Sequence, residues 1–183
     1  MLDAYNRDAL FLLNGIATSH PIFGVVSIFF ALWFPYIVIG TVIVYELYSA
    51  EKEKRIAVSV IRTLTPALVT LSLVLLFKYI YPAARPFVLD SGIVPLVSVS
   101  DPFGSFPSAH AAIFGSLAGA MLAERFHAWK WYFISAFIIG VARIAVGVHW
   151  PLDVLAGLVF GFAVGFLIAR SFEMIEKYQD KAS

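Results

Sequence analysis

The sequence contains no cysteine and few charged residues. The absence of cysteine excludes disulfides, thiolate metal ligands and thiol nucleophiles. Charged residues make up only 14% of the chain, against roughly 25% in soluble domains. Hydrophobic residues make up 61% and aromatic residues 16%. This balance leaves no room for a separate soluble domain and favours a membrane protein. The net charge of +1 gives no reason to expect a nucleic-acid partner.

Long apolar segments alternate with short polar ones. A spanning helix needs about 20 mostly apolar residues, and we expect such helices at 21–48, 56–81, 107–124, 129–149 and 151–173. Residues 3–18 alternate polar and apolar groups at near-helical spacing, which predicts that 1–20 form an amphipathic interfacial helix. The alternative is a sixth, distorted span. We therefore expect one integral membrane domain over 1–183, an all-α, polytopic helical bundle of five or six spans.

Basic residues in short loops mark the cytoplasmic side of a membrane protein. Three basic groups fall on one side of the five-span arrangement: Lys52, Lys54 and Arg55; Arg125 and Lys130; and Arg170, Lys177 and Lys181. The opposite face then carries the long loop 82–106, and loops of this length are often functional. We expect the chain in the plasma or inner membrane, with 82–106 as an extracytoplasmic active-site loop.

Several ionisable residues fall near this outer face, where charges are costly. Burying one charge in hydrocarbon costs at least ~2.5–3.5 kcal/mol, so several cations need an anionic partner. Arginine offers forked donors that suit phosphate oxygens, and lysine adds a point charge. Taken singly, the lysine would be an interfacial anchor and each histidine structural. Together they indicate a phosphate site: Lys78, Arg85, His110, Arg143, His149 and Asp153.

Local patterns place some of these residues at helix starts. In GSFPSAH, we expect Ser105 to cap the third spanning helix and Pro107 to lie in its first turn. The free N–H groups of that turn favour an anion. Pro151 should open the last helix, and Asp153, four residues after His149, is spaced to orient the imidazole.

Three motifs also carry a family resemblance. KYIYPAARP at 78–86 fits KxxxxxxRP, FPSAH at 106–110 resembles PSGH, and RIAVGVHWPLD at 143–153 fits RxxxxxHxxxD. Their order and spacing resemble the type 2 phosphatidic acid phosphatase superfamily, which comprises membrane lipid phosphatases and soluble vanadium haloperoxidases. Two positions depart from its pattern: Ala109 replaces glycine, and Ala142 replaces the serine that usually precedes the arginine.

The resemblance implies a role for each matching residue. His149 would attack phosphorus and form a phosphohistidine, Asp153 would orient His149, and His110 would protonate the leaving oxygen. No metal and no other cofactor is implied. The residues that would hold the phosphoryl group are Lys78, Arg85, Ser108, Ala109 and Arg143.

We therefore expect a membrane hydrolase that acts on a phosphorylated lipid. A compact chain with an extracytoplasmic site resembles the undecaprenyl diphosphate phosphatases of cell-wall synthesis. Phosphatidylglycerophosphate and phosphatidic acid phosphatases share the motifs and are alternatives. A haloperoxidase holding vanadate is another, although the apolar composition argues against it. A non-catalytic phospholipid transporter or channel is a fourth, because buried charges also line such pathways.

Overall fold

The computed structural model of the chain describes residues 2–53 and 56–182, with side-chain surroundings for 4–45, 61–175 and 178. This part forms helices joined by turns and one long loop, and it contains no β-strand. The expected all-α class is confirmed. The elements are α1 (Leu2–Ser19), α2 (Pro21–Ile28), the π-helical segment η1 (Phe29–Trp33), α3 (Phe34–Glu53), α4 (Ile56–Ile80), α5 (Pro86–Leu89), α6 (Ala109–Ala123), α7 (Trp129–Ala145) and α8 (Pro151–Ala182).

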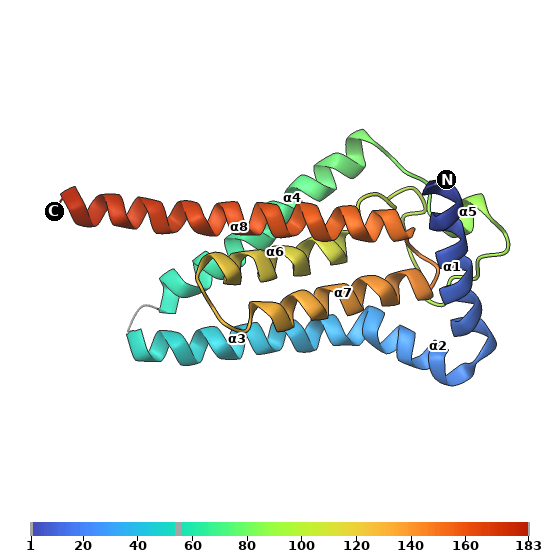
Figure 1. Cartoon of the computed structure of the whole chain (residues 1–183), viewed down its shortest axis with the longest axis horizontal. Helices are drawn as coiled ribbons and strands as arrows, with labels where there is room; N and C mark the ends of the chain where they lie inside the picture. Colours follow the sequence, from blue (N-terminus) through green and yellow to red (C-terminus); the bar gives the residue numbers. More distant parts are fainter. Residues whose placement is uncertain (1, 54–55, 183) are drawn as a thin grey trace.

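The long helices run lengthwise in a bundle, and α1 crosses one end of it (Figure 1). Three segments are long and apolar enough to cross a membrane, at Pro21–Tyr45, Ile61–Ile80 and Pro151–Ile175. Helix α6 is apolar but shorter. Large apolar side chains of α8 face outward, including Leu155, Val159 and Leu167, each more than half exposed. Apolar surface of this kind is expected where a helix contacts lipid.

The loop between α4 and α6 has structure of its own. It contains the short helix α5 and a single parallel bridge between Ala83 and Gly104. The amide of Ser105 donates to the carbonyl of Ala83 at 3.0 Å, and the amide of Arg85 donates to Pro102 at 2.9 Å. The two ends of the loop are therefore held side by side, next to the end of α4 and the start of α6.

Helices α6 and α8 approach closely through glycine. A Cβ atom at Gly161 or Gly165 would overlap the carbonyl oxygen of Ala112 or Ser116, and one at Gly119 would overlap that of Phe162. The glycines that recur every four residues on α8 therefore form a packing face, as small residues do between membrane helices. This contact fixes the start of α6 against the start of α8.

Alanine at Gly161 should destabilise the bundle, because its methyl group meets the backbone of Ala112. Overpacking of this kind costs about 1–3 kcal/mol. The matched control is Gly40→Ala in α3, where a Cβ meets nothing within 4 Å. Thermal unfolding in detergent micelles should show a lower Tm for Gly161→Ala and an unchanged or higher Tm for Gly40→Ala. Equal Tm values for the two variants would contradict the close α6–α8 contact.

Candidate active site

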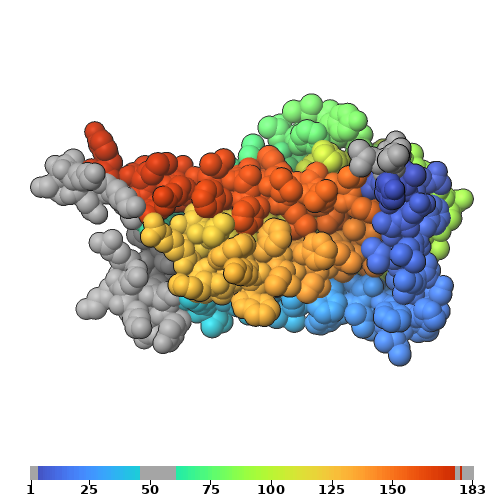
Figure 2. Space-filling model, viewed as in Figure 1, coloured from blue at the N-terminus to red at the C-terminus, as the bar shows by residue number. Residues whose placement is uncertain are grey.

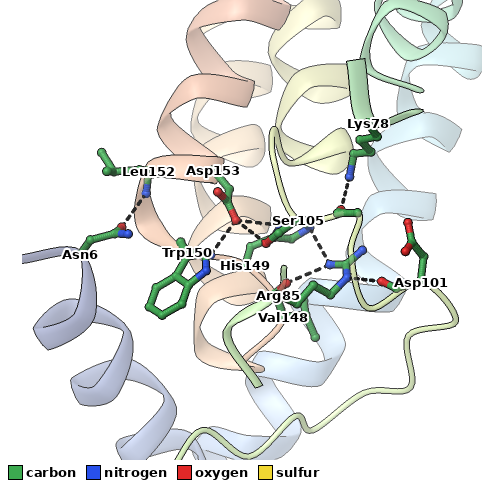
Figure 3. A network of polar contacts seen from close by, with 11 residues as sticks. Asn6, Lys78, Arg85, Asp101, Ser105, Val148, His149, Trp150, Leu152 and Asp153 are labelled. Atoms are coloured by element: carbon green, nitrogen blue, oxygen red, sulfur yellow. Dashed lines mark hydrogen bonds and ion pairs between the residues drawn. The ribbon is translucent and has the colours of Figure 1, made fainter. Parts of the chain in front are cut away.

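Every residue that the sequence analysis assigned to the site lies at one end of the bundle. Helix α4 ends there, α6 begins, α7 ends and α8 begins. The close-up shows side chains from α4, the long loop and the start of α8 meeting around His149 (Figure 3). The structure brings together Lys78, Arg85, Ser108, Ala109, His110, Arg143, His149 and Asp153.

His149 and Asp153 form a buried pair. Their side chains are 2% and 6% exposed, and Nδ1 of His149 lies 3.5 Å from Oδ2 of Asp153, a long contact for a hydrogen bond. The same carboxylate oxygen accepts from the hydroxyl of Ser105 at 2.6 Å and from the amide of Trp150 at 2.9 Å. Asp153 is thus held from two further directions, and its carboxylate faces the imidazole.

Arg85 lies against the other ring nitrogen of His149. Its Nη1 lies 3.4 Å from Nε2 of the imidazole. Because a guanidinium only donates, this contact favours the tautomer in which Nε2 is unprotonated and Nδ1 carries the hydrogen, facing Asp153. Arg85 is itself held, because its Nη1 donates to the carbonyl of Val148 at 2.9 Å and its Nε to that of Asp101 at 2.7 Å. The lone pair of Nε2 therefore points toward the cationic side of the site.

Burial keeps His149 neutral. It lowers the pKa of His149 to about 4, and the nearby Arg143 and Arg85 act in the same direction, whereas the contact with Asp153 opposes the shift. Burial also lowers the pKa of Arg85 from its ordinary value, against the effect of Asp101 and Asp153. Near neutral pH the imidazole of His149 thus keeps one unprotonated nitrogen, as a nucleophile requires.

The protonation of His149 can be followed by histidine NMR in micelles. Because burial favours the neutral ring, His149 should stay neutral as the pH falls through 6.5 and take up a proton only near 4. As the pH falls from 6.5 to 4, the unfolded chain takes up this proton before the folded protein does. The free energy of unfolding should therefore decrease over this range. The signal should be absent from a His149→Asn variant. A midpoint at or above 6.5 would mean that Asp153 outweighs burial.

Three buried polar side-chain atoms lack a hydrogen-bond partner among the residues whose side chains are described. They are Oγ of Ser108, Nε of Arg143 and Nδ1 of His149. Buried polar groups in proteins are normally paired, so their concentration at one site is informative. Ser108 is the N-cap residue of α6, but its side chain makes no capping bond. Its hydroxyl and Nε of Arg143 are donors suited to the oxygens of an anion.

Two further features add to the anion-binding character of the site. The first amides of α6 have no acceptor within the helix, and the positive end of the helix dipole lies there. His110, in the first turn of α6, lies within electrostatic range of the cations Arg143, Lys78 and Arg85.

Within the described residues, no group of three or more His, Cys, Asp or Glu side chains is placed to hold a metal ion.

The predicted start of α6 was wrong. The helix begins at Ala109 with Ser108 as its N-cap, so Ser105 does not cap it and Pro107 precedes its first turn. The physical reason is that the hydroxyl of Ser105 donates to the buried carboxylate of Asp153 instead. Local sequence spacing gives no indication of this contact, because Asp153 lies 48 residues after Ser105.

The two residues that depart from the family pattern lie in α7 and α6. Ala142 is buried in an apolar cluster with Ala31, Val146 and Val148. Its methyl group needs no polar partner there. Ala109 is the first residue of α6 and is partly exposed. Its methyl group leaves the backbone amide of the first turn in place.

An apolar pocket of about 380 Å³ lies between α4 and α8. Its walls include Phe77 and Ile80 of α4 and Phe160 of α8, and Phe106 and Pro107 close the side next to Ser108. Phe77 and Pro107 are the sequence neighbours of Lys78 and Ser108, so the pocket lies beside the candidate site.

Comparisons with known proteins find a matching family model and several similar proteins. A family model described as the PAP2 superfamily matches residues 56–177. The chain is 29% identical to YbjG of Escherichia coli (strain K12), whose name gives it provisionally as an undecaprenyl-diphosphatase, over 93% of this chain and 83% of that protein. It is 41% identical over 71 residues to the lipid A 1-phosphatase of Rhizobium johnstonii, covering 38% of this chain and 29% of that protein.

A solved structure is also similar. The crystal structure of Aquifex aeolicus LpxE superimposes with a TM-score of 0.69 and 29% identity, over 90% of this chain and 94% of that chain. The residues matched by the family model contain all three motifs, whereas α1, α2 and α3 precede them.

Proposed function

The chain belongs to the PAP2 superfamily, and from this premise we propose that it is a polyprenyl diphosphate phosphatase with His149 as its nucleophile. It is a membrane protein and a lipid phosphatase, a hydrolase of phosphate esters. The polyprenyl substrate is supported by the similarity to YbjG, which extends over most of both chains. A second candidate is lipid A 1-phosphate, supported by the identity with the Rhizobium johnstonii enzyme over a shorter stretch.

One observation carries the proposal: the unpaired donors of Ser108 and Arg143 lie in the same site as Nε2 of His149, which is in contact with Arg85. A phosphoryl group in contact with Nε2 would accept hydrogen bonds from these donors and from the first amides of α6. Lys78 and Arg85 would neutralise its remaining charge. Phosphoryl transfer depends mainly on such positioning and charge stabilisation, which these side chains supply without a metal ion or other cofactor.

In the proposed reaction, Nε2 of His149 attacks the terminal phosphorus. The bond from phosphorus to the bridging oxygen breaks, and His110 protonates that oxygen as the polyprenyl monophosphate leaves. The resulting phosphohistidine carries positive charge on the imidazole, which Asp153 stabilises through the Nδ1 hydrogen. Water, deprotonated by His110, then attacks the phosphohistidine and releases inorganic phosphate. Ser105 keeps the carboxylate of Asp153 in place throughout.

In the membrane, we propose one domain over 1–183 with five spans, formed by α2 with η1 and α3, then α4, α6, α7 and α8. The orientation of α1 across the end of the bundle supports an interfacial position (Figure 1). The site and the loop 82–106 then face the extracytoplasmic side of the plasma or inner membrane. The basic groups that motivate this orientation fall partly outside the described residues, at Lys54 and Arg55. The apolar pocket beside Phe106 would receive the lipid tail.

Phosphate release from purified protein tests the proposal. The substrates are undecaprenyl diphosphate, lipid A 1-phosphate, phosphatidic acid and phosphatidylglycerophosphate, each in detergent micelles. We expect undecaprenyl diphosphate to have the highest kcat/KM. His149→Ala should reduce release more than about a thousandfold, as loss of a nucleophile does. The control is His127→Ala, which removes an exposed histidine beyond the far end of α6.

Turnover by His149→Ala close to that of the His127→Ala control would refute the nucleophile. Preference for lipid A 1-phosphate would replace the polyprenyl substrate with the second candidate. If the protein moved phosphorylated lipid across vesicles without releasing phosphate, it would be a transporter.

A further inference from the structure

Helix α1 contacts the segment that carries His149, although it lies outside the residues matched by the family model. In the space-filling view, α1 covers the end of the bundle next to the start of α8 (Figure 2). Polar side chains in a membrane helix bundle are costly unless they are paired. The two asparagines of α1, Asn6 and Asn14, are paired with backbone groups on either side of His149.

Asn14 is 2% exposed, and its amide makes three hydrogen bonds. Its Nδ2 donates to the carbonyl of Ala145 and to that of Val94, each at 2.9 Å. Its Oδ1 accepts from the amide of Val94 at 3.0 Å. Asn14 therefore ties the end of α7 to the long loop, only two residues after Arg143.

Asn6 holds the other end of the same segment. Its Oδ1 accepts from the amide of Leu152 at 3.0 Å (Figure 3). That amide lies in the first turn of α8, where backbone donors have no acceptor within the helix. Asn6 and Asn14 are eight residues apart, or ~12 Å along a helix. Their backbone partners bracket residues 145–152, with His149 between them.

The turn between Ala145 and His149 also packs against Asn14. Gly147 has a φ of +78°, a conformation that favours glycine. A Cβ there would lie 3.0 Å from Nδ2 of Asn14 and 2.9 Å from the carbonyl oxygen of Val94. The amide of Leu96 also donates to the carbonyl of Val146 at 3.0 Å. The turn before His149 is thus packed directly on the amide of Asn14.

We infer that α1 is part of the catalytic apparatus, and that Asn14 and Asn6 are positioning residues for His149. By holding both ends of residues 145–152, they keep Nε2 directed at the phosphoryl group and Nδ1 directed at Asp153. The inference rests on the proposed role of His149 as nucleophile. A displacement of about 1 Å at a reacting atom can cost about a hundredfold in rate, so loss of either contact should lower kcat more than it changes KM.

Two variants test the role of α1, with undecaprenyl diphosphate and, in parallel, phosphatidic acid as substrates. Asn14→Leu keeps the size of the side chain and removes all three hydrogen bonds. We expect kcat to fall about ten- to a hundredfold with KM changed less than about threefold. Asn6→Ala removes one bond from a half-buried residue. We expect a loss of kcat of about three- to tenfold with an unchanged Tm. Because Asn6→Ala should fold even if Asn14→Leu does not, it carries the test in that case.

Two controls separate positioning from general stability. Asp8→Ala removes an exposed polar side chain from the same helix and should leave kcat unchanged. Thr70→Val removes a buried hydrogen bond to Ser116 in the middle of the bundle, and it should lower Tm without lowering kcat. The inference is overturned if the asparagine variants lower Tm as Thr70→Val does but keep the wild-type kcat.

His149→Ala in the same assay distinguishes this failure from failure of the proposed function. If His149→Ala abolishes turnover while both asparagine variants keep kcat, only the positioning role is wrong. If His149→Ala retains turnover, the nucleophile and the positioning role both fall.

Discussion

Two buried arginines are the constraint on which the site depends. Arg85 and Arg143 are each 6% exposed inside an apolar bundle, and among the described side chains Asp153 is the buried acidic residue. Its carboxylate already accepts hydrogen bonds from Ser105 and the backbone of Trp150. Cations at such depth are costly without an anion, which supports the proposal that the site binds a group with several negative charges. A phosphorylated lipid headgroup meets this requirement, and the apolar surface beside it suits the tail.

The rest of the fold supplies the rigidity that such a site needs. The glycine contacts fix α6 against α8, and so place Ser108 beside the start of α8, where its amide donates to the carbonyl of Asp153 at 3.0 Å. The long loop brings Arg85 to the carbonyl of Val148. Helix α1 covers the end of the bundle and contacts the segment that carries His149. Lys78 donates to the carbonyl of Gly104, and Arg85 donates to the carbonyls of Asp101 and Val148, so backbone groups position both of these cations.

The sequence predicts features that depend on neighbouring residues better than contacts between residues far apart in the chain. The spans are local apolar patterns, so α4 and the start of α8 at Pro151 agree closely with expectation. The site residues lie in three short motifs, and their shared placement near one face indicates a phosphate site although no single residue does. The contacts of Ser105 and Asn14 could not be predicted, because their partners lie 48 and 131 residues away. A polar side chain within the apolar stretch LFLLNGIA was the available signal for Asn14.

A crystal structure grown with orthovanadate tests the account most directly, because vanadate adopts the five-coordinate geometry of phosphoryl transfer. The account predicts vanadium bonded to Nε2 of His149, with its oxygens accepting from Oγ of Ser108 and Nε of Arg143. Vanadate bound elsewhere, or a site occupied with those two donors still unpaired, would contradict it.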